Sequence, residues 1–193
     1  MLTLSPRHQI TIVTILALMM ILTRSHHFAS VHHLADASWA IFFLAGIYLR
    51  PIWSLPTFFA LSWVLDFAAY TWGGVSDFCL TPAYVFLLPA YGSMWLAGRW
   101  FAKQYQFSWR TIVPLATSSF AGLALCELFS SGGFYLFSGR FENTTIAEYF
   151  TRSVTYFPLY AETFVTYLGI AAAIHMLFAF LAAQTNSSTP QIH

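Results

Sequence analysis

The chain has 193 residues, of which 58% are hydrophobic and only 8% are charged. A soluble domain carries roughly 25% charged residues and cannot hide this much apolar surface at this length, so the composition excludes an ordinary soluble protein and favours the bilayer as solvent. The net charge of +1, from 8 basic and 7 acidic residues, gives no case for a nucleic-acid partner.

Six apolar segments have the length and composition expected of membrane helices, which need about 20 mainly apolar residues. In chain order they are residues 8–24, 35–50, 53–71, 82–102, 110–130 and 157–183. We therefore predict an all-α protein with one six-helix membrane domain over residues 1–183 and a polar tail at 184–193. The first segment lacks a good small-residue cleavage site, which favours a retained helix over a signal peptide. Segment 35–50 is short, so we expect it to be tilted or partly embedded.

The connections between these segments differ in character. They are predicted at residues 25–34, 51–52, 72–81, 103–109 and 131–156. The third contains Gly73-Gly74 and Cys79. The last follows a helix-breaking run, Ser130-Ser131-Gly132-Gly133, and is expected to be a long loop with a short surface helix near 145–156.

Lys and Arg in short loops indicate the orientation in the membrane. With the N-terminus in the cytoplasm, five of these residues lie inside and three outside. The inner set is Arg7, Arg50, Arg99, Lys103 and Arg110, and the outer set is Arg24, Arg140 and Arg152. Six crossings return the C-terminus to the cytoplasm. The prediction is a multi-pass protein of a cytoplasmic membrane whose connections 25–34, 72–81 and 131–156 share the outer face.

Three acidic residues fall inside predicted helices, and all three lie near the outer ends: Asp66, Glu127 and Glu162. At about 1.5 Å per residue they sit roughly 6–8 Å below the outer surface. Charge within a membrane segment is costly and usually faces a cavity or a partner. The pattern predicts a polar bowl that is open to the outside.

Cys79 lies in the Gly-rich connection above this bowl. Free cysteine usually prefers burial, whereas a loop thiol can bind a soft metal as thiolate. One cysteine cannot build a closed zinc site, which needs four protein ligands, but it can supply one axial bond to a metal already held in a macrocycle. Cys126, inside a predicted helix, is interpreted as packing, and two cysteines make no disulfide framework.

Two other constellations remain open. Four histidines, His26, His27, His32 and His33, suit either metal capture or a solvated interfacial loop. The first interpretation gives an alternative function, a membrane redox protein that holds haem or copper in this loop. His175 is interpreted as packing.

Aromatic residues make up 19% of the chain, and some near the outer connections, Phe78, Tyr84 and Tyr156 among them, could line an apolar pocket for a large flat ligand. Arg152 forms either a simple helix pair with Glu148 or a contact to a phosphate or amide of the ligand.

Six helices with an outward ligand bowl resemble the S-components of energy-coupling-factor (ECF) vitamin transporters. Asp66, the run from Gly73-Gly74 to Cys79-Leu80-Thr81-Pro82-Ala83-Tyr84, and Arg152 resemble the BtuM family of cobalamin transporters. The resemblance implies uptake of cobalamin (vitamin B12) or related corrinoids across a bacterial cytoplasmic membrane. It implies Cys79 as the axial ligand of the substrate's cobalt, with Asp66, Tyr84 and Arg152 as pocket residues.

The chain departs from typical S-components at its first helix, where a small-residue AxxxA pattern serves docking of the coupling subunit. Here Ala17 has Val13 and Ile21 at that spacing. The absence of a Walker motif indicates that the chain does not hydrolyse ATP itself. The departure at the first helix fits a solitary S-component of the BtuM type and argues against use of a shared ATPase module. A thiolate donor on cobalt is also expected to help expel an upper cyanide in the presence of a reductant, so Cys79 is a candidate for accessory decyanation of cyanocobalamin.

Overall fold

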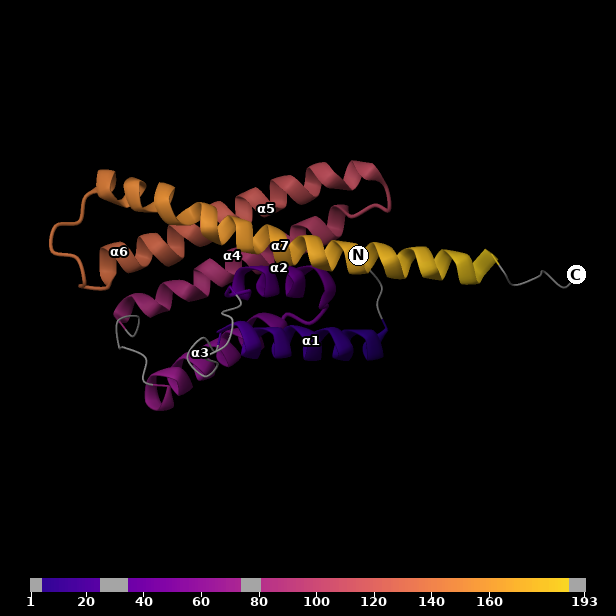
Figure 1. The fold of residues 1–193 in the computed structure, drawn as a ribbon, viewed down its shortest axis with the longest axis horizontal. Coiled ribbons are helices and arrows are strands. Elements are labelled where there is room, and N and C mark those ends of the chain that lie inside the picture. The colour runs from indigo at the N-terminus through magenta and orange to yellow at the C-terminus, as the bar shows by residue number, and fades with distance from the viewer. Residues whose placement is uncertain (1–4, 25–34, 74–80, 188–193) are drawn as a thin grey trace, which may run out of the picture.

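The computed structural model describes residues 5–24, 35–73 and 81–187, and over these residues its regular structure is entirely helical (Figure 1). The α-helices are α1 (Pro6–Arg24), α2 (Ser38–Tyr48), α3 (Ser54–Trp72), α4 (Leu87–Gln104), α5 (Ile112–Glu127), α6 (Gly133–Phe137) and α7 (Ile146–Ser187). Two 3₁₀ turns, η2 (Pro82–Phe86) and η3 (Trp109–Thr111), precede α4 and α5, and a π-helical turn, η4 (Leu128–Gly132), joins α5 to α6. The predicted all-α class is confirmed.

Among the described residues, three helical stretches are long and apolar enough to cross a membrane: Pro6–Arg24, Trp109–Phe137 and Ile146–Leu181. The most apolar window of the last stretch is only 6% buried within the protein. Large apolar side chains such as Val165, Ile174 and Phe178 therefore face outward, where a soluble protein would carry polar groups. Lipid is the solvent that tolerates such a surface, and the chain is a membrane protein.

The short helix α2 lies at the centre of the bundle. Ile41, Phe42, Phe43 and Ala45 are completely buried, and the helix packs against α1, α3, α4 and α7. Its 11 residues rise only about 16 Å, roughly half of a hydrocarbon core. The prediction of a short helix is therefore confirmed, and its all-apolar surface is covered by the surrounding helices.

Helices α2 and α4 approach each other through glycine. A Cβ atom on Gly46 would overlap the carbonyl oxygen of Trp95, and one on Gly98 would overlap the carbonyl oxygen of Phe43. The two contacts are reciprocal, so each helix presents a glycine to the backbone of the other. Small residues at a membrane helix interface permit such close packing, which increases the area of contact.

The long loop predicted at 131–156 is wrong. Helical structure continues from Trp109 through η4 and α6 to Phe137, and α7 begins at Ile146, so only about eight residues separate them. The glycines of the predicted breaker run serve close packing instead: Gly133 lies against the Phe86 ring and Gly132 against the Tyr149 ring. The predicted surface helix near 145–156 is the first part of α7, a continuous 42-residue helix that contains Pro158.

Helix α7 also extends past the predicted start of the polar tail, to Ser187. Its second half is fastened to the bundle by His175. The Tyr48 hydroxyl lies 3.2 Å from Nδ1 of this histidine, and the Tyr105 hydroxyl lies 2.8 Å from Nε2. The interpretation of His175 as a packing residue is thus confirmed, with the addition that both ring nitrogens have hydrogen-bond partners.

The helix ends that flank the predicted outer connections gather at one end of the bundle (left in Figure 1). These are the ends of α1 and α3, the turn η2, helix α6 and the beginning of α7. The beginning of α1 and the end of α7 point to the opposite end. The Tyr167 hydroxyl donates to the carbonyl of Ala35, so Tyr167 of α7 lies level with the start of α2. The 21 residues of α7 that precede Tyr167 therefore extend about 30 Å beyond the start of α2.

Candidate functional site

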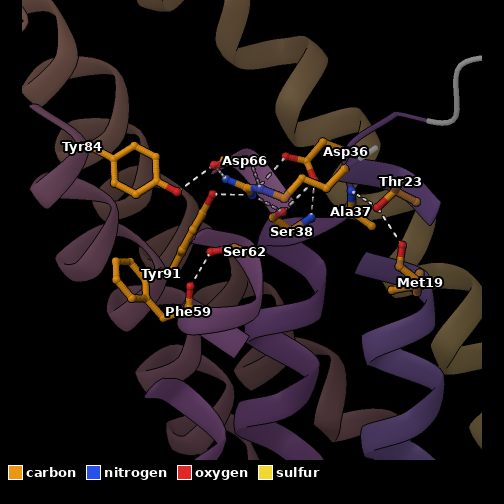
Figure 2. A network of polar contacts seen from close by, with 11 residues as sticks. Met19, Thr23, Asp36, Ala37, Ser38, Phe59, Ser62, Asp66, Tyr84 and Tyr91 are labelled. Carbon is orange, nitrogen blue, oxygen red and sulfur yellow. Dashed lines mark hydrogen bonds and ion pairs between the residues drawn. The ribbon is translucent and has the colours of Figure 1, made fainter. Parts of the chain in front are cut away.

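Arg24, the last residue of α1, lies at the centre of a network of polar side chains at the end of the bundle described above. Its Nε donates to Oδ1 of Asp66 over 2.6 Å, and its Nη2 donates to Oδ2 of the same carboxylate over 2.7 Å (Figure 2). This two-pronged pairing of guanidinium and carboxylate is the strong, geometrically defined form of an ion pair. The Arg24 side chain is only 10% exposed, so the pair is largely shielded from solvent.

The third guanidinium nitrogen of Arg24, Nη1, connects α1 to α2 and α4. Nη1 donates to the Ser38 hydroxyl over 2.7 Å and to the Tyr91 hydroxyl over 2.8 Å, and it lies 3.7 Å from Oδ2 of Asp36. We call Arg24, Asp36, Ser38, Asp66, Tyr84 and Tyr91 the Arg24 cluster. With one cation and two carboxylates it has a formal charge of −1, and it joins α1, α2, α3, η2 and α4.

Hydrogen bonds made by Asp36 and Thr23 set the start of α2 and thereby place Ser38 in the Arg24 cluster. Asp36 Oδ1 accepts hydrogen bonds from the backbone N–H and the hydroxyl of Ser38, at 2.9 and 2.6 Å, which is the Asx pattern that starts a helix. The Thr23 hydroxyl accepts the backbone N–H of Ala37 over 3.2 Å and donates to the carbonyl of Met19. These bonds fix the end of α1 against the start of α2 (Figure 2).

Tyr84 brings η2 into the cluster. Its hydroxyl donates to Oδ2 of Asp66 over 2.7 Å, across 18 residues of chain. The structure thus unites two of the predicted pocket residues, Asp66 and Tyr84. Residues 73–81 lie between Asp66 and Tyr84 in sequence and join α3 to η2. The hydrogen bond between Asp66 and Tyr84 therefore sets the distance between α3 and η2, the two elements that this segment connects.

Arg152 belongs to a second cluster, on α6 and α7. Its Nε and Nη2 donate to Oε1 of Glu148 over 3.0 and 2.8 Å, and the Tyr135 hydroxyl donates to Oε2 of the same carboxylate over 2.9 Å. The guanidinium carbon lies 4.7 Å from the centre of the Phe141 ring. Since the Arg152 side chain is 43% exposed, its charge remains accessible from outside.

The other predicted site residues are less constrained. Tyr156, one helical turn beyond Arg152, is 53% exposed. Phe78 and Cys79 lie outside the described residues, as do the four histidines of the predicted first connection, His26, His27, His32 and His33. Cys126 is a buried free cysteine, which agrees with its interpretation as packing.

The three helix acids occupy three different environments. Asp66 pairs with Arg24. Glu127 is buried and accepts hydrogen bonds from the hydroxyls of Ser131 and Ser153, at 2.9 and 3.2 Å. Glu162 lies exposed on α7. Each acid therefore has its own surroundings: an arginine, two serine hydroxyls, and the exposed face of α7.

Sequence reasoning missed Arg24, which it treated only as a charge outside the membrane. The signal was present, because an arginine at the end of one membrane helix is the natural partner for an aspartate near the same end of another. Within residues 5–24, 35–73 and 81–187, no group of three or more His, Cys, Asp or Glu side chains is arranged to hold a bare metal ion.

No protein-family model matches the chain, and no curated protein matches it.

Proposed function

We propose that the protein takes up cobalamin or related corrinoids across a bacterial cytoplasmic membrane, as a six-helix transporter of the S-component type with both termini in the cytoplasm. The observation that carries the proposal is the 2.7 Å hydrogen bond between Tyr84 and Asp66. The sequence resemblance assigns both residues to a corrinoid pocket, and they stand on either side of the segment that contains Cys79.

The geometry sharpens the role of Asp66. Both of its oxygens accept donors from Arg24, and one also accepts the Tyr84 hydroxyl. A carboxylate so engaged serves best as a positioning residue, which holds η2 and α3 at a set distance. We therefore assign Asp66 to the orientation of Tyr84 and of the Cys79 segment, in preference to direct contact with the corrin amides.

Arg152 and the rings beside it support recognition of a large amphipathic ligand. Its guanidinium is accessible and lies over the Phe141 ring, while Tyr156 exposes a further aromatic surface one turn along α7. Aromatic faces suit a flat macrocycle, and a charged donor suits the phosphate or amide groups at its edge. We assign these residues to the rim of the pocket.

Cys79 is assigned to the cobalt of the bound substrate, as thiolate, on the outer side of the membrane. Two equivalents of an external thiol, oxidised to a disulfide with release of two protons, would reduce the cobalt(III) of two cyanocobalamin molecules to cobalt(II). In each molecule the bond between cobalt and carbon would break and cyanide would leave as the anion, an accessory activity beside transport.

The cobalt bond has a direct spectroscopic test. We expect Cys79→Ala to return the visible spectrum of bound cobalamin toward that of the free vitamin, because a thiolate ligand changes the absorption of cobalt and alanine cannot replace it. Cys126→Ala is the matched control and should leave the spectrum unchanged, since this thiol is buried in the bundle. Identical spectra for the parent protein and Cys79→Ala would exclude the thiolate assignment. An intense Soret band in the purified protein would indicate haem instead.

Transport is tested by growth. A bacterial strain that requires cobalamin and lacks its own transporter should grow on scarce vitamin when it expresses this chain alone, without an added ECF ATPase module. Cys79→Ala should abolish or strongly reduce this growth, and Cys126→Ala should preserve it. Growth that is equal with the chain and with an empty vector would contradict uptake.

A further inference from the structure

A groove of about 500 Å³ runs between α4 and α5, and its lining includes no residue of either polar cluster. It is lined by Pro89, Gly92, Ser93, Leu96, Ala97, Trp100, Ser118, Ala121, Gly122, Leu125 and Phe129. Three of these side chains, Leu96, Trp100 and Leu125, are 46–60% exposed, so the groove opens sideways from the bundle toward lipid.

The groove needs an occupant that forms no hydrogen bonds. Its two buried serines are satisfied internally: the Ser93 hydroxyl donates to the carbonyl of Ala90 over 2.6 Å, and the Ser118 hydroxyl donates to that of Leu115 over 3.0 Å. A Cβ atom added to Gly92 would meet nothing within 4 Å, so there is open space over this residue. A hydrocarbon chain meets these conditions.

The dimensions also fit a lipid. From Pro89 to Trp100 is 11 residues of helix, or about 16 Å. This is roughly half of the 30 Å hydrocarbon core, the depth of one leaflet.

Two cations stand at one end of the groove. Lys103 follows Trp100 by one turn of α4, and Arg110 precedes Ser118 by about two turns. Both are exposed, and neither forms an ion pair with a described residue. Arg99 is engaged elsewhere, since it donates to the carbonyl of Arg50 and lies over the Trp95 ring.

The acidic residues do not compensate these cations. Five of the six in the described part of the chain lie toward the opposite end of their helices or in the connections there: Asp36, Asp66, Glu127, Glu142 and Glu148. The sixth, Glu162, lies in the interior of α7. The exposed rings of Trp100 and Trp109 suit the level of the lipid headgroups.

We infer that the α4–α5 groove is a binding site for an anionic phospholipid of the surrounding bilayer, with an acyl chain between Gly92 and Gly122 and the phosphate at Lys103 and Arg110. This site is independent of corrinoid transport. A bound lipid would fill the lateral gap between α4 and α5 and stabilise the pair against separation.

Lipid retention by the full-length chain in detergent tests the charge requirement. In native mass spectrometry we expect phosphatidylglycerol to bind about 30-fold more tightly than phosphatidylcholine of the same acyl chains. The double variant Lys103→Gln/Arg110→Gln should lose that preference, at about fivefold per charge, because a cation near an anionic lipid contributes about 1 kcal/mol. Arg7→Gln is the matched control and should keep it, since Arg7 lies on α1, on the far side of α2.

Filling the groove tests its location. Gly92→Leu and, separately, Ala121→Leu should each reduce binding of phosphatidylglycerol at least tenfold, whereas Gly169→Leu, on the exposed face of α7, should not change it. Circular dichroism and monodisperse elution identify the variants that fold, and Ala121→Leu keeps the test valid if Gly92→Leu does not. Equal binding of the two lipids, unchanged binding in both groove variants, or a groove occupied by a second copy of the chain would each overturn the inference.

Discussion

Replacement of Arg24 by glutamine is expected to lower the free energy of unfolding by about 3–5 kcal/mol, the cost of leaving one partner of a buried ion pair uncompensated. Asp66 would keep the Tyr84 hydroxyl but would lose both charged donors. Ser38 and Tyr91 would also lose the group that connects them. The loss therefore affects contacts among α1, α2, α3 and α4 at once.

Reversible unfolding in mixed detergent micelles measures this effect. The double variant Arg24→Gln/Asp66→Asn should be more stable than Arg24→Gln alone, since it removes the unpaired carboxylate, and the double-mutant cycle gives the coupling energy. Arg152→Gln is the control. Its ion pair with Glu148 is 43% and 42% exposed and is screened by solvent, so its loss should lower the stability far less than the loss of Arg24 does. Equal costs for Arg24→Gln and Arg152→Gln would show that the Arg24 cluster is not a buried, strongly coupled unit.

The second large effect is expected at the crossing of α2 and α4. Gly46→Ala and Gly98→Ala should each lower the free energy of unfolding by about 3 kcal/mol, at the upper end of what overpacking usually costs. The added methyl group would meet a backbone carbonyl in each case, Trp95 or Phe43, and a backbone cannot move aside as a flexible side chain can. Relief requires that the two helices separate, which would open the core around Phe42 and Met94.

The control for this prediction is Gly169→Ala. A Cβ atom on Gly169 meets nothing within 4 Å, and the residue is exposed on α7. Alanine is the better helix former by about 1 kcal/mol, so this variant should be neutral or slightly more stable. The same unfolding assay checks all three variants. If Gly46→Ala or Gly98→Ala is as stable as Gly169→Ala, the close α2–α4 contact is not what holds the two helices together.

Helix positions in the first two thirds of the chain were predictable. The segments expected at 8–24, 53–71 and 82–102 correspond closely to α1, α3 and η2 with α4. Each has a run of apolar residues bounded by charges, glycine or proline, and those boundaries are local properties. The run Ser130-Ser131-Gly132-Gly133 misled the prediction because its glycines make room for the Phe86 and Tyr149 rings, which come from distant parts of the chain.

The candidate site was only partly predictable. Asp66 and Tyr84 were both selected from the sequence, and the structure brings them into contact. Arg24 was not selected, because its place at a helix end makes it a candidate partner for Asp66 but does not show that it points inward at that residue, 42 positions away. The partner of a buried charge is determined by helix packing, and helix packing depends on contacts between segments that are far apart in sequence.

By itself the sequence determined that this is an all-helical membrane protein, because so apolar a chain with so few charges has no other solvent. It also indicated which end of the helices carries the acids and which end carries Lys103 and Arg110. Only the tertiary structure decided that α2 is the core, that Arg24 is the centre of the polar cluster, and that α4 and α5 leave a groove. The physical reason is that the composition of a segment determines whether water or lipid is its favourable solvent. The close approach at Gly46 and Gly98 and the ion pair between Arg24 and Asp66 depend instead on which helices are neighbours.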